Sequence, residues 1–234
     1  MNNMISFITH HVELLCLMAG STTLSFIWVF VFNREKMNAK WWDALLAAVA
    51  ATITGIIGTI LFGAVESGFQ SLGAMSLFGS VFIVPLFCLI YAKIKKLPLG
   101  DVLDVFTVVL VISLVFARIN CLIQGCCYGK QIGDTEYSYP TRQIEIGFNV
   151  IFIGVAIFLI LKNKMQKKIY LIYLVAYGFF RFILEFFRYS DTTAPFHNGH
   201  IWSFLSLTIG IALLIILHYL NKQKELNEGK TKKR

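Results

Sequence analysis

The chain has 234 residues, of which 57% are hydrophobic and only 15% are charged, and its formal net charge is +8. Soluble domains are usually about one quarter charged, so this composition excludes an ordinary water-soluble domain. Apolar stretches of about 20 residues, enough to cross a bilayer, recur with only short connections between them. We therefore expect one all-α, polytopic membrane domain over residues 1–234, with no separate soluble domain.

Seven stretches are apolar enough for membrane-spanning helices. They lie at residues 12–33, 42–64, 76–95, 101–123, 144–161, 168–187 and 201–220. The first is the weakest, because His10, His11 and Glu13 lie at its start. The N-terminus has neither a basic region nor a small-residue cleavage site, so we expect no removed signal peptide.

Lysine and arginine gather in alternate connections between these helices. The basic residues of these connections are Arg34, Lys36, Lys40, Lys93, Lys95, Lys96, Lys162, Lys164, Lys167 and Lys168, and six more lie in the tail at 221–234. Because basic loops stay in the cytoplasm, we expect the N-terminus outside and a basic cytoplasmic tail. The positive charge then reflects topology and anionic lipid headgroups, and we expect no nucleic-acid partner.

The remaining basic residues fall on the outer side, where that rule disfavours them. They are Arg118, Lys130, Arg142, Arg181 and Arg188. Ionisable groups within a membrane cost about 2.5–3.5 kcal/mol each on insertion scales and usually mark function. Glu145 and Glu185 supply part of the opposite charge. The surplus indicates a site for an anion near the outer leaflet.

The sixth helix contains YGFFRFILEFFRYSD, residues 177–191. Tyr177, Arg181, Glu185 and Arg188 are spaced by 4, 4 and 3 residues, which places them on one helical stripe. Lipid cannot satisfy polar groups, so this stripe must face protein or a water-filled cavity. It is either a charge ladder that only joins helices or part of a functional site.

The segment after the fourth helix favours a functional site. It reads ARINCLIQGCCYGK (117–130), in which Arg118 lies near the outer end of the helix. Gly125 and Gly129 permit close backbone approach or a left-handed turn. Because an arginine fork binds two phosphate oxygens at once, arginines from two helices at headgroup depth predict a phospholipid headgroup clamp.

A short external segment, GDTEYSYPTRQIEIG (133–147), leads into the fifth helix. We expect Thr141 to cap this helix and Glu145 to lie about one turn in.

Three segments together resemble the prolipoprotein diacylglyceryl transferases of bacteria. They are ARINCLIQGCCYGK (117–130), YPTRQIE (139–145) and YGFFRFILEFFR (177–188), and GAMSLFGS (73–80) is similar to a further family segment. The third is the most specific, and the resemblance covers residues 73–210 loosely. It implies a multi-pass protein of the bacterial cytoplasmic membrane, with seven spans and a site that faces the outer leaflet.

The resemblance also implies a reaction. Family members move the diacylglyceryl group of phosphatidylglycerol to the cysteine thiol of a preprolipoprotein signal sequence, and glycerol 1-phosphate leaves. No cofactor or metal is implied. By position, Arg118 matches the phosphatidylglycerol-binding arginine, and Arg181 and Glu185 match the essential pair. The expected substrate-binding residues are Arg118, Gly129, Arg142, Arg188 and Tyr177, and the expected catalytic residues are Arg181, Glu185, Tyr139 and Glu145.

The sequence departs from the family pattern at several positions. Phe78 and Tyr139 stand where the family has histidine. Arg142 replaces a glutamine, Cys121 an asparagine and Cys126 a glutamate. These departures keep two alternatives open: a paralogous lipid transferase with a different acceptor, and a non-catalytic phospholipid-binding scaffold.

The departure at Phe78 removes a candidate base. Positive charge lowers the pKa of a thiol, so an arginine field could activate the acceptor without a base. Its members would be Arg118, Arg142, Arg181 and Arg188. Glu145 and Tyr139 are the alternatives. We expect the field to act, with Glu145 in a positional role.

Other polar residues are expected to serve structure. The cysteines are Cys16, Cys88, Cys121, Cys126 and Cys127. Cys-x4-Cys-Cys is not a zinc spacing, so packing or interface roles are favoured over redox or metal roles. His197 and His200 could touch the site, but we expect them to be solvated. Asp101 and Asp104 begin the fourth helix, where negative charge favours the helix dipole.

Overall fold

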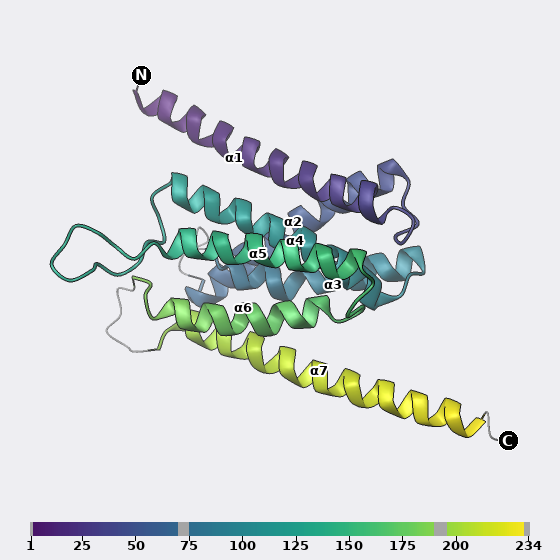
Figure 1. Ribbon diagram of the computed structural model, residues 1–234. Coiled ribbons are helices and arrows are strands. Elements are labelled where there is room, and N and C mark those ends of the chain that lie inside the picture. The colour runs from purple at the N-terminus through teal and green to yellow at the C-terminus, as the bar shows by residue number, and fades with distance from the viewer. Residues whose placement is uncertain (1, 70–74, 190–195, 232–234) are drawn as a thin grey trace.

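The computed structural model describes residues 2–69, 75–189 and 196–231, and in these ranges the chain is all-α, as predicted (Figure 1). The elements are α1 (Asn2–Ile27), the π-helical turn η1 (Trp28–Phe32), α2 (Trp41–Glu66), α3 (Leu77–Lys95), α4 (Leu99–Ile123), α5 (Thr141–Leu161), α6 (Ile169–Glu185) and α7 (Asn198–Thr231). Residues 73–74 of GAMSLFGS, 190–191 of the charged segment and 232–234 of the tail lie outside the described residues.

Six of these helices are long and apolar enough to cross a membrane. They are the helices that contain Leu15–Phe32, Trp41–Glu66, Leu77–Lys95, Leu99–Ile123, Thr141–Leu161 and Asn198–Gln223. The helix left over from the seven predicted spans is α6, which has 17 residues. It rises about 26 Å at ~1.5 Å per residue, slightly less than the ~30 Å hydrocarbon core.

The two terminal helices are longer than predicted. α1 begins at Asn2 instead of residue 12, and α7 continues to Thr231 instead of ending at residue 220. The described part of the predicted tail is therefore helical.

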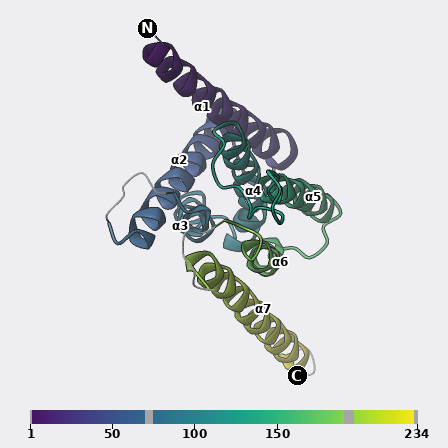
Figure 2. The ribbon, with the colours of Figure 1, turned by 90° about the vertical axis from the view of Figure 1, so that its left-hand side faces the viewer.

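α4 is the central helix of the bundle. Its run from Val102 to Val115 is apolar almost all round and mostly buried, as expected for a helix surrounded by others. α1 and α7 lie on opposite sides of the bundle (Figure 2). α5 packs on α4, α3 on α2 and α7 on α6, whereas α5 and α6 meet only slightly.

Small residues let two helix pairs approach closely. A Cβ atom on Gly58 of α2 would lie 2.6 Å from the carbonyl oxygen of Gly79 in α3, and one on Gly79 would collide with the Gly58 backbone. In the second pair, a Cβ on Gly178 of α6 would lie 2.7 Å from the Leu207 nitrogen of α7. Such small-residue contacts are typical of membrane helix interfaces.

Ion pairs join the basic connections at one end of the bundle. Lys36, before α2, lies 3.6 Å from Asp101 at the start of α4. Lys95, at the end of α3, lies 2.9 Å from Asp43 at the start of α2. Figure 1 shows the α1–α2, α3–α4 and α5–α6 connections together at the right-hand end, opposite the α4–α5 segment.

Asp104 does more than the predicted helix-dipole role. Its carboxylate is buried and accepts the backbone N–H groups of Lys167 at 2.5 Å and Ile169 at 3.0 Å. It therefore ties the α5–α6 connection to α4, and Asp101 is the acidic residue in the first turn of α4.

Candidate functional site

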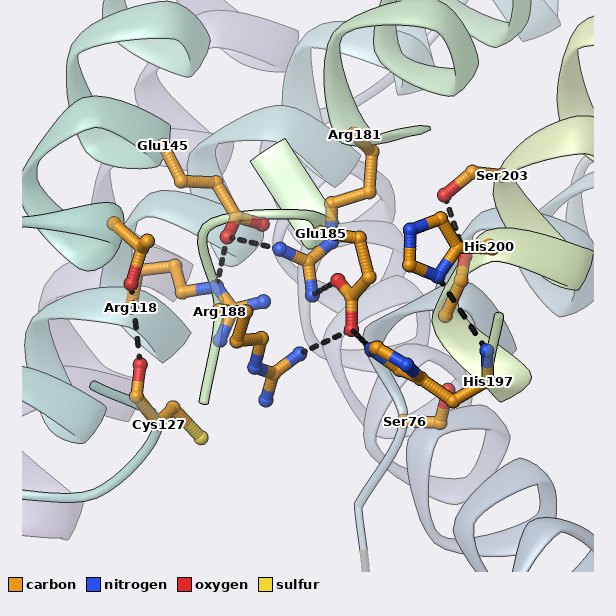
Figure 3. Close-up of polar contacts among 12 residues, drawn as sticks. Ser76, Arg118, Cys127, Glu145, Arg181, Glu185, Arg188, His197, His200 and Ser203 are labelled. Atoms are coloured by element: carbon orange, nitrogen blue, oxygen red, sulfur yellow. Dashed lines mark hydrogen bonds and ion pairs between the residues drawn. The ribbon is translucent and has the colours of Figure 1, made fainter. Parts of the chain in front are cut away.

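A buried charged cluster lies at the other end of the bundle, where three helices meet (Figure 3). Arg118 comes from the last turns of α4, Glu145 from the second turn of α5, and Arg181 and Glu185 from the last turns of α6. The side chains of Arg118 and Arg181 are each 4% exposed and that of Glu145 is 2% exposed. The predicted polar stripe on α6 therefore faces protein.

Glu145 is the common acceptor of this cluster. Its Oε2 atom lies 2.8 Å from Arg118 Nε and accepts a hydrogen bond from Arg181 Nη1 at 3.3 Å. The Tyr177 hydroxyl donates to Oε1 of the same carboxylate at 2.9 Å. One carboxylate on α5 thus holds two guanidinium groups from α4 and α6, which fixes their relative position.

Glu185 forms the second half of the cluster. Its Oε2 atom lies 2.9 Å from Arg181 Nη2, and its Oε1 atom lies 3.7 Å from Arg188 Nη1. His197 Nε2 lies 3.3 Å from the same Oε1 atom. Three guanidinium groups face two carboxylates, so the cluster has one positive charge in excess. Arg188 and His197 are 25% and 21% exposed, which makes their side the accessible one.

The α4–α5 segment packs against the end of α6. Gly129 pairs with Arg188 in an isolated antiparallel bridge, and the Lys130 N–H donates to the Phe187 carbonyl at 2.8 Å. A Cβ on Gly129 would collide with the Tyr139 carbonyl and lie 2.9 Å from that of Phe187. The predicted close approach at Gly129 is confirmed, and at this point the segment lies directly against the end of α6.

Arg142 does not join the charged cluster. Its Nη1 atom donates to the carbonyl oxygens of Cys121 at 3.2 Å and Cys126 at 3.0 Å. The predicted cap at Thr141 is wrong, because α5 begins at Thr141 itself and Pro140 holds the capping position. The Thr141 hydroxyl instead donates to the Cys127 carbonyl at 3.5 Å. The start of α5 therefore fixes the cysteine-containing turn.

Tyr139 lies apart from the buried charges. It is 36% exposed, and its ring packs against Phe187 with centroids 5.2 Å apart. Both rings line an apolar cavity of about 570 Å³ between α5 and α6, whose walls include Phe148 and Phe180. The weak contact between these helices leaves this opening beside the cluster.

The model of one family, prolipoprotein diacylglyceryl transferase, matches residues 4–216. The chain belongs to this family. It is 23% identical over 227 residues to the phosphatidylglycerol–prolipoprotein diacylglyceryl transferase of Dehalococcoides mccartyi, with 86% of each chain covered.

Two further relatives have the same name. The protein of Chlorobaculum tepidum is 28% identical over 179 residues, which cover 68% of this chain and 62% of that protein. The protein of Acinetobacter baumannii is 23% identical over 222 residues, which cover 80% and 82%. The resemblance inferred from the sequence motifs is confirmed.

This member of the prolipoprotein diacylglyceryl transferase family has an apolar ring at position 78. Phe78 is buried, and its ring centroid lies 5.6 Å from that of Tyr177. Tyr177 in turn stacks on Tyr173, whose hydroxyl donates to Asn149 Oδ1 at 3.1 Å. The polar stripe of α6 thus extends further along the helix, to Tyr173, than we predicted. The four-residue spacings of Tyr173 from Tyr177 and of Asn149 from Glu145 could have indicated this.

The expectation of solvation is wrong for His200, whereas His197 is partly exposed and also contacts Glu185. His200 is 2% exposed, and its ring lies among those of Phe182, Phe186 and Phe196. Its Nδ1 atom accepts the His197 N–H at 3.5 Å. The burial arises because the start of α7 packs on the end of α6, a contact that linear spacing does not reveal.

Three thiols are the group of candidate metal ligands found among the described residues. The Sγ atoms of Cys121, Cys126 and Cys127 all lie within 4.8 Å of one another. The pKa of Cys127 is lowered to about 4, first by a hydrogen bond from the Cys121 thiol and then by the charges of Arg188 and Arg118. Burial raises the pKa of Cys126.

Proposed function

We propose that this protein transfers the diacylglyceryl group of phosphatidylglycerol to the cysteine thiol of a preprolipoprotein signal sequence and releases glycerol 1-phosphate. Family membership and the relatives over most of the chain support this reaction. The observation that carries it is the buried charged cluster with surplus positive charge beside an apolar cavity. An anionic headgroup joined to acyl chains matches both features.

The lipid phosphate would bind at Arg118 and Arg181. Arg188 is the more exposed guanidinium, so it would meet the headgroup first. The acyl chains would lie in the opening between α5 and α6, whose lining is aromatic and aliphatic. Glu145 and Glu185 would orient the arginine forks, since each holds two charged side chains.

The chemistry is a displacement at an sp³ carbon. The acceptor thiolate attacks the glyceryl carbon attached to the phosphate oxygen, a C–S bond forms and the C–O bond breaks. The electron pair of that bond stays on the departing phosphate, where the arginines stabilise the added charge. The protein otherwise contributes by holding two lipidic substrates in line.

The site would face the outer leaflet of the bacterial cytoplasmic membrane. The excess of lysine and arginine in the connections at the opposite end supports this orientation. Preprolipoprotein signal sequences would then reach the cluster from the outer side.

The test uses purified full-length protein with phosphatidylglycerol vesicles and a peptide that contains the acceptor cysteine. We expect release of glycerol phosphate together with a peptide whose mass has increased by the diacylglyceryl group. The matched control is the same peptide with serine in place of its cysteine, which should give no release. Binding of phosphatidylglycerol without any turnover would contradict the transferase and support a non-catalytic phospholipid-binding scaffold.

A further inference from the structure

The three clustered thiols are not explained by the lipid clamp. Cys121 lies in the last turn of α4, and Cys126 and Cys127 follow that helix. Each is only partly buried, and their sulfur atoms lie within 4.8 Å of one another. The linear spacing differs from that of common zinc motifs, so the convergence depends on how the chain folds after α4.

The backbone of this turn is held in an unusual shape. Gly125 has a φ of +66°, and Cys127 has a φ of +60°, which is uncommon for a residue with a side chain. Arg142 bonds the carbonyls of Cys121 and Cys126 from α5. Strained residues that a surrounding structure over-determines gather at functional sites, so the turn is a pre-formed support for its thiols.

The thiol geometry fits a thiophilic cation. With Zn–S bonds of about 2.3 Å and tetrahedral angles, the sulfurs of a zinc site lie about 3.8 Å apart. The present separations need a contraction of about 1 Å at most, which side-chain rotation can supply. Three protein ligands with an open fourth position are characteristic of catalytic rather than structural zinc sites.

Charge also fits this assignment. Three thiolates and one divalent cation leave one negative charge. Cys127 lies close enough to Arg118 and Arg188 to interact with both charges, as Figure 3 illustrates. The negative charge of the thiolate set is therefore held within reach of two of the arginines that surround the proposed lipid phosphate.

We propose that Cys121, Cys126 and Cys127 bind a divalent cation of the zinc type, and that the acceptor cysteine thiol binds as its fourth ligand. The second part rests on the proposed function. The metal would deprotonate the acceptor thiol, which the ring of Phe78 cannot do, because a thiol that coordinates a metal is deprotonated. The acceptor then needs no protein base.

The step balances without a redox partner. On coordination, the acceptor thiol loses its proton to water and binds as a thiolate. Its sulfur attacks the glyceryl carbon, the C–S bond forms, and the C–O electron pair leaves with the phosphate. The product is a neutral thioether, a weaker ligand than a thiolate, so it leaves the metal and the fourth position opens for the next acceptor.

The first experiment measures the metal directly. Reduced full-length protein without a histidine tag is stripped with a chelator and titrated with Co²⁺. We expect one Co²⁺ per chain with sulfur-to-cobalt charge-transfer absorption. Cys121→Ser, Cys126→Ser and Cys127→Ser should each weaken binding by at least the roughly 10–100-fold that the loss of an outer-shell partner costs. Cys16→Ser changes an exposed thiol in α1 and is the matched control, with unchanged binding.

The second experiment tests the fourth ligand. The acceptor peptide should alter the charge-transfer band of the Co²⁺ protein, and its cysteine-to-serine version should not. Chelator-stripped protein should lose transfer activity by roughly 10²–10⁴-fold, the usual contribution of a proton-transfer group, and Zn²⁺ should restore it. Phosphatidylglycerol binding should be unchanged throughout, which separates this role from the lipid clamp.

The outcomes distinguish the two proposals. Failure of the three free thiols to bind Co²⁺ or Zn²⁺, or a disulfide between two of them in protein taken from membranes, would overturn the metal site alone. Metal binding with full activity in stripped protein would overturn its role in acceptor activation. A spectral response to the peptide without lipid turnover in any state would support the metal site and reject the proposed transfer reaction.

Discussion

At the scale of single residues, Glu145 determines the geometry of the site. Its two oxygens face Arg118, Arg181 and Tyr177, and its side chain is almost fully buried. A carboxylate whose oxygens are so occupied by donors has little access to an acceptor thiol. We therefore assign it a positioning role, as the sequence led us to expect, and treat its proposed role as a base as the weaker alternative.

Arg181→Lys tests whether the planar fork matters beyond its charge. Lysine keeps the positive charge but cannot bond Glu145 and Glu185 with one rigid group. We expect the rate of glycerol phosphate release to fall by roughly 10²-fold, as when one donor to a developing negative charge is lost.

The control is Arg34→Lys, the same change at an exposed position in the α1–α2 connection. It should leave both lipid binding and turnover unchanged. If Arg181→Lys protein of normal thermal stability binds and turns over phosphatidylglycerol as the parent does, the clamp is wrong.

Tyr139→Phe and Glu145→Gln separate the two candidate bases. Phenylalanine retains the packing of Tyr139 on Phe187, so we expect nearly parental turnover. Glutamine removes the charge between two buried guanidinium groups, and breaking such a pair costs about 3–5 kcal/mol. We expect a lower unfolding temperature and loss of lipid binding together. A stable Glu145→Gln protein that binds lipid but has no transfer activity would instead identify Glu145 as the base.

At the scale of elements, the sequence predicts what depends on local spacing. The 4, 4 and 3 spacing of polar residues predicts the buried stripe of α6, and Gly129 predicts a close approach. The sequence does not predict the burial of His200 or the hydrogen bonds from Arg142 to the cysteine turn. Those contacts join segments that are distant in sequence, and their geometry depends on two left-handed residues and on how α7 meets α6.

Gly79→Val tests the close crossing of α2 and α3. A side chain on Gly79 meets the backbone of Gly58, which cannot move without separating the helices. Overpacking of a tight interface costs about 1–3 kcal/mol or more, so we expect a clear fall in the unfolding temperature in detergent. Gly154→Val in α5 is the matched control, because its Cβ would meet nothing within 4 Å. Equal unfolding temperatures for both variants would contradict the close crossing.

At the scale of the whole molecule, the two ends of the bundle have different chemistry. One end carries the basic connections, tied together by Asp43, Asp101 and Asp104. The other carries the charged cluster, the cysteine turn and the apolar cavity lined by Tyr139. The alternation of basic loops along the sequence anticipated this division, because each crossing moves the chain from one end to the other.

The orientation of these ends is tested by labelling whole cells with a membrane-impermeant thiol reagent. Gln166→Cys lies in the α5–α6 connection at the basic end, and Glu136→Cys lies in the α4–α5 segment at the other, and both positions are exposed. Labelling of the parent chain measures the background from its own cysteines. Above that background, Glu136→Cys should gain label and Gln166→Cys should not. Both should gain label once the membrane is permeabilised, which shows that each thiol is reactive. The reverse pattern in intact cells would place the charged cluster on the cytoplasmic side, where secreted signal-sequence cysteines could not reach it after crossing the membrane.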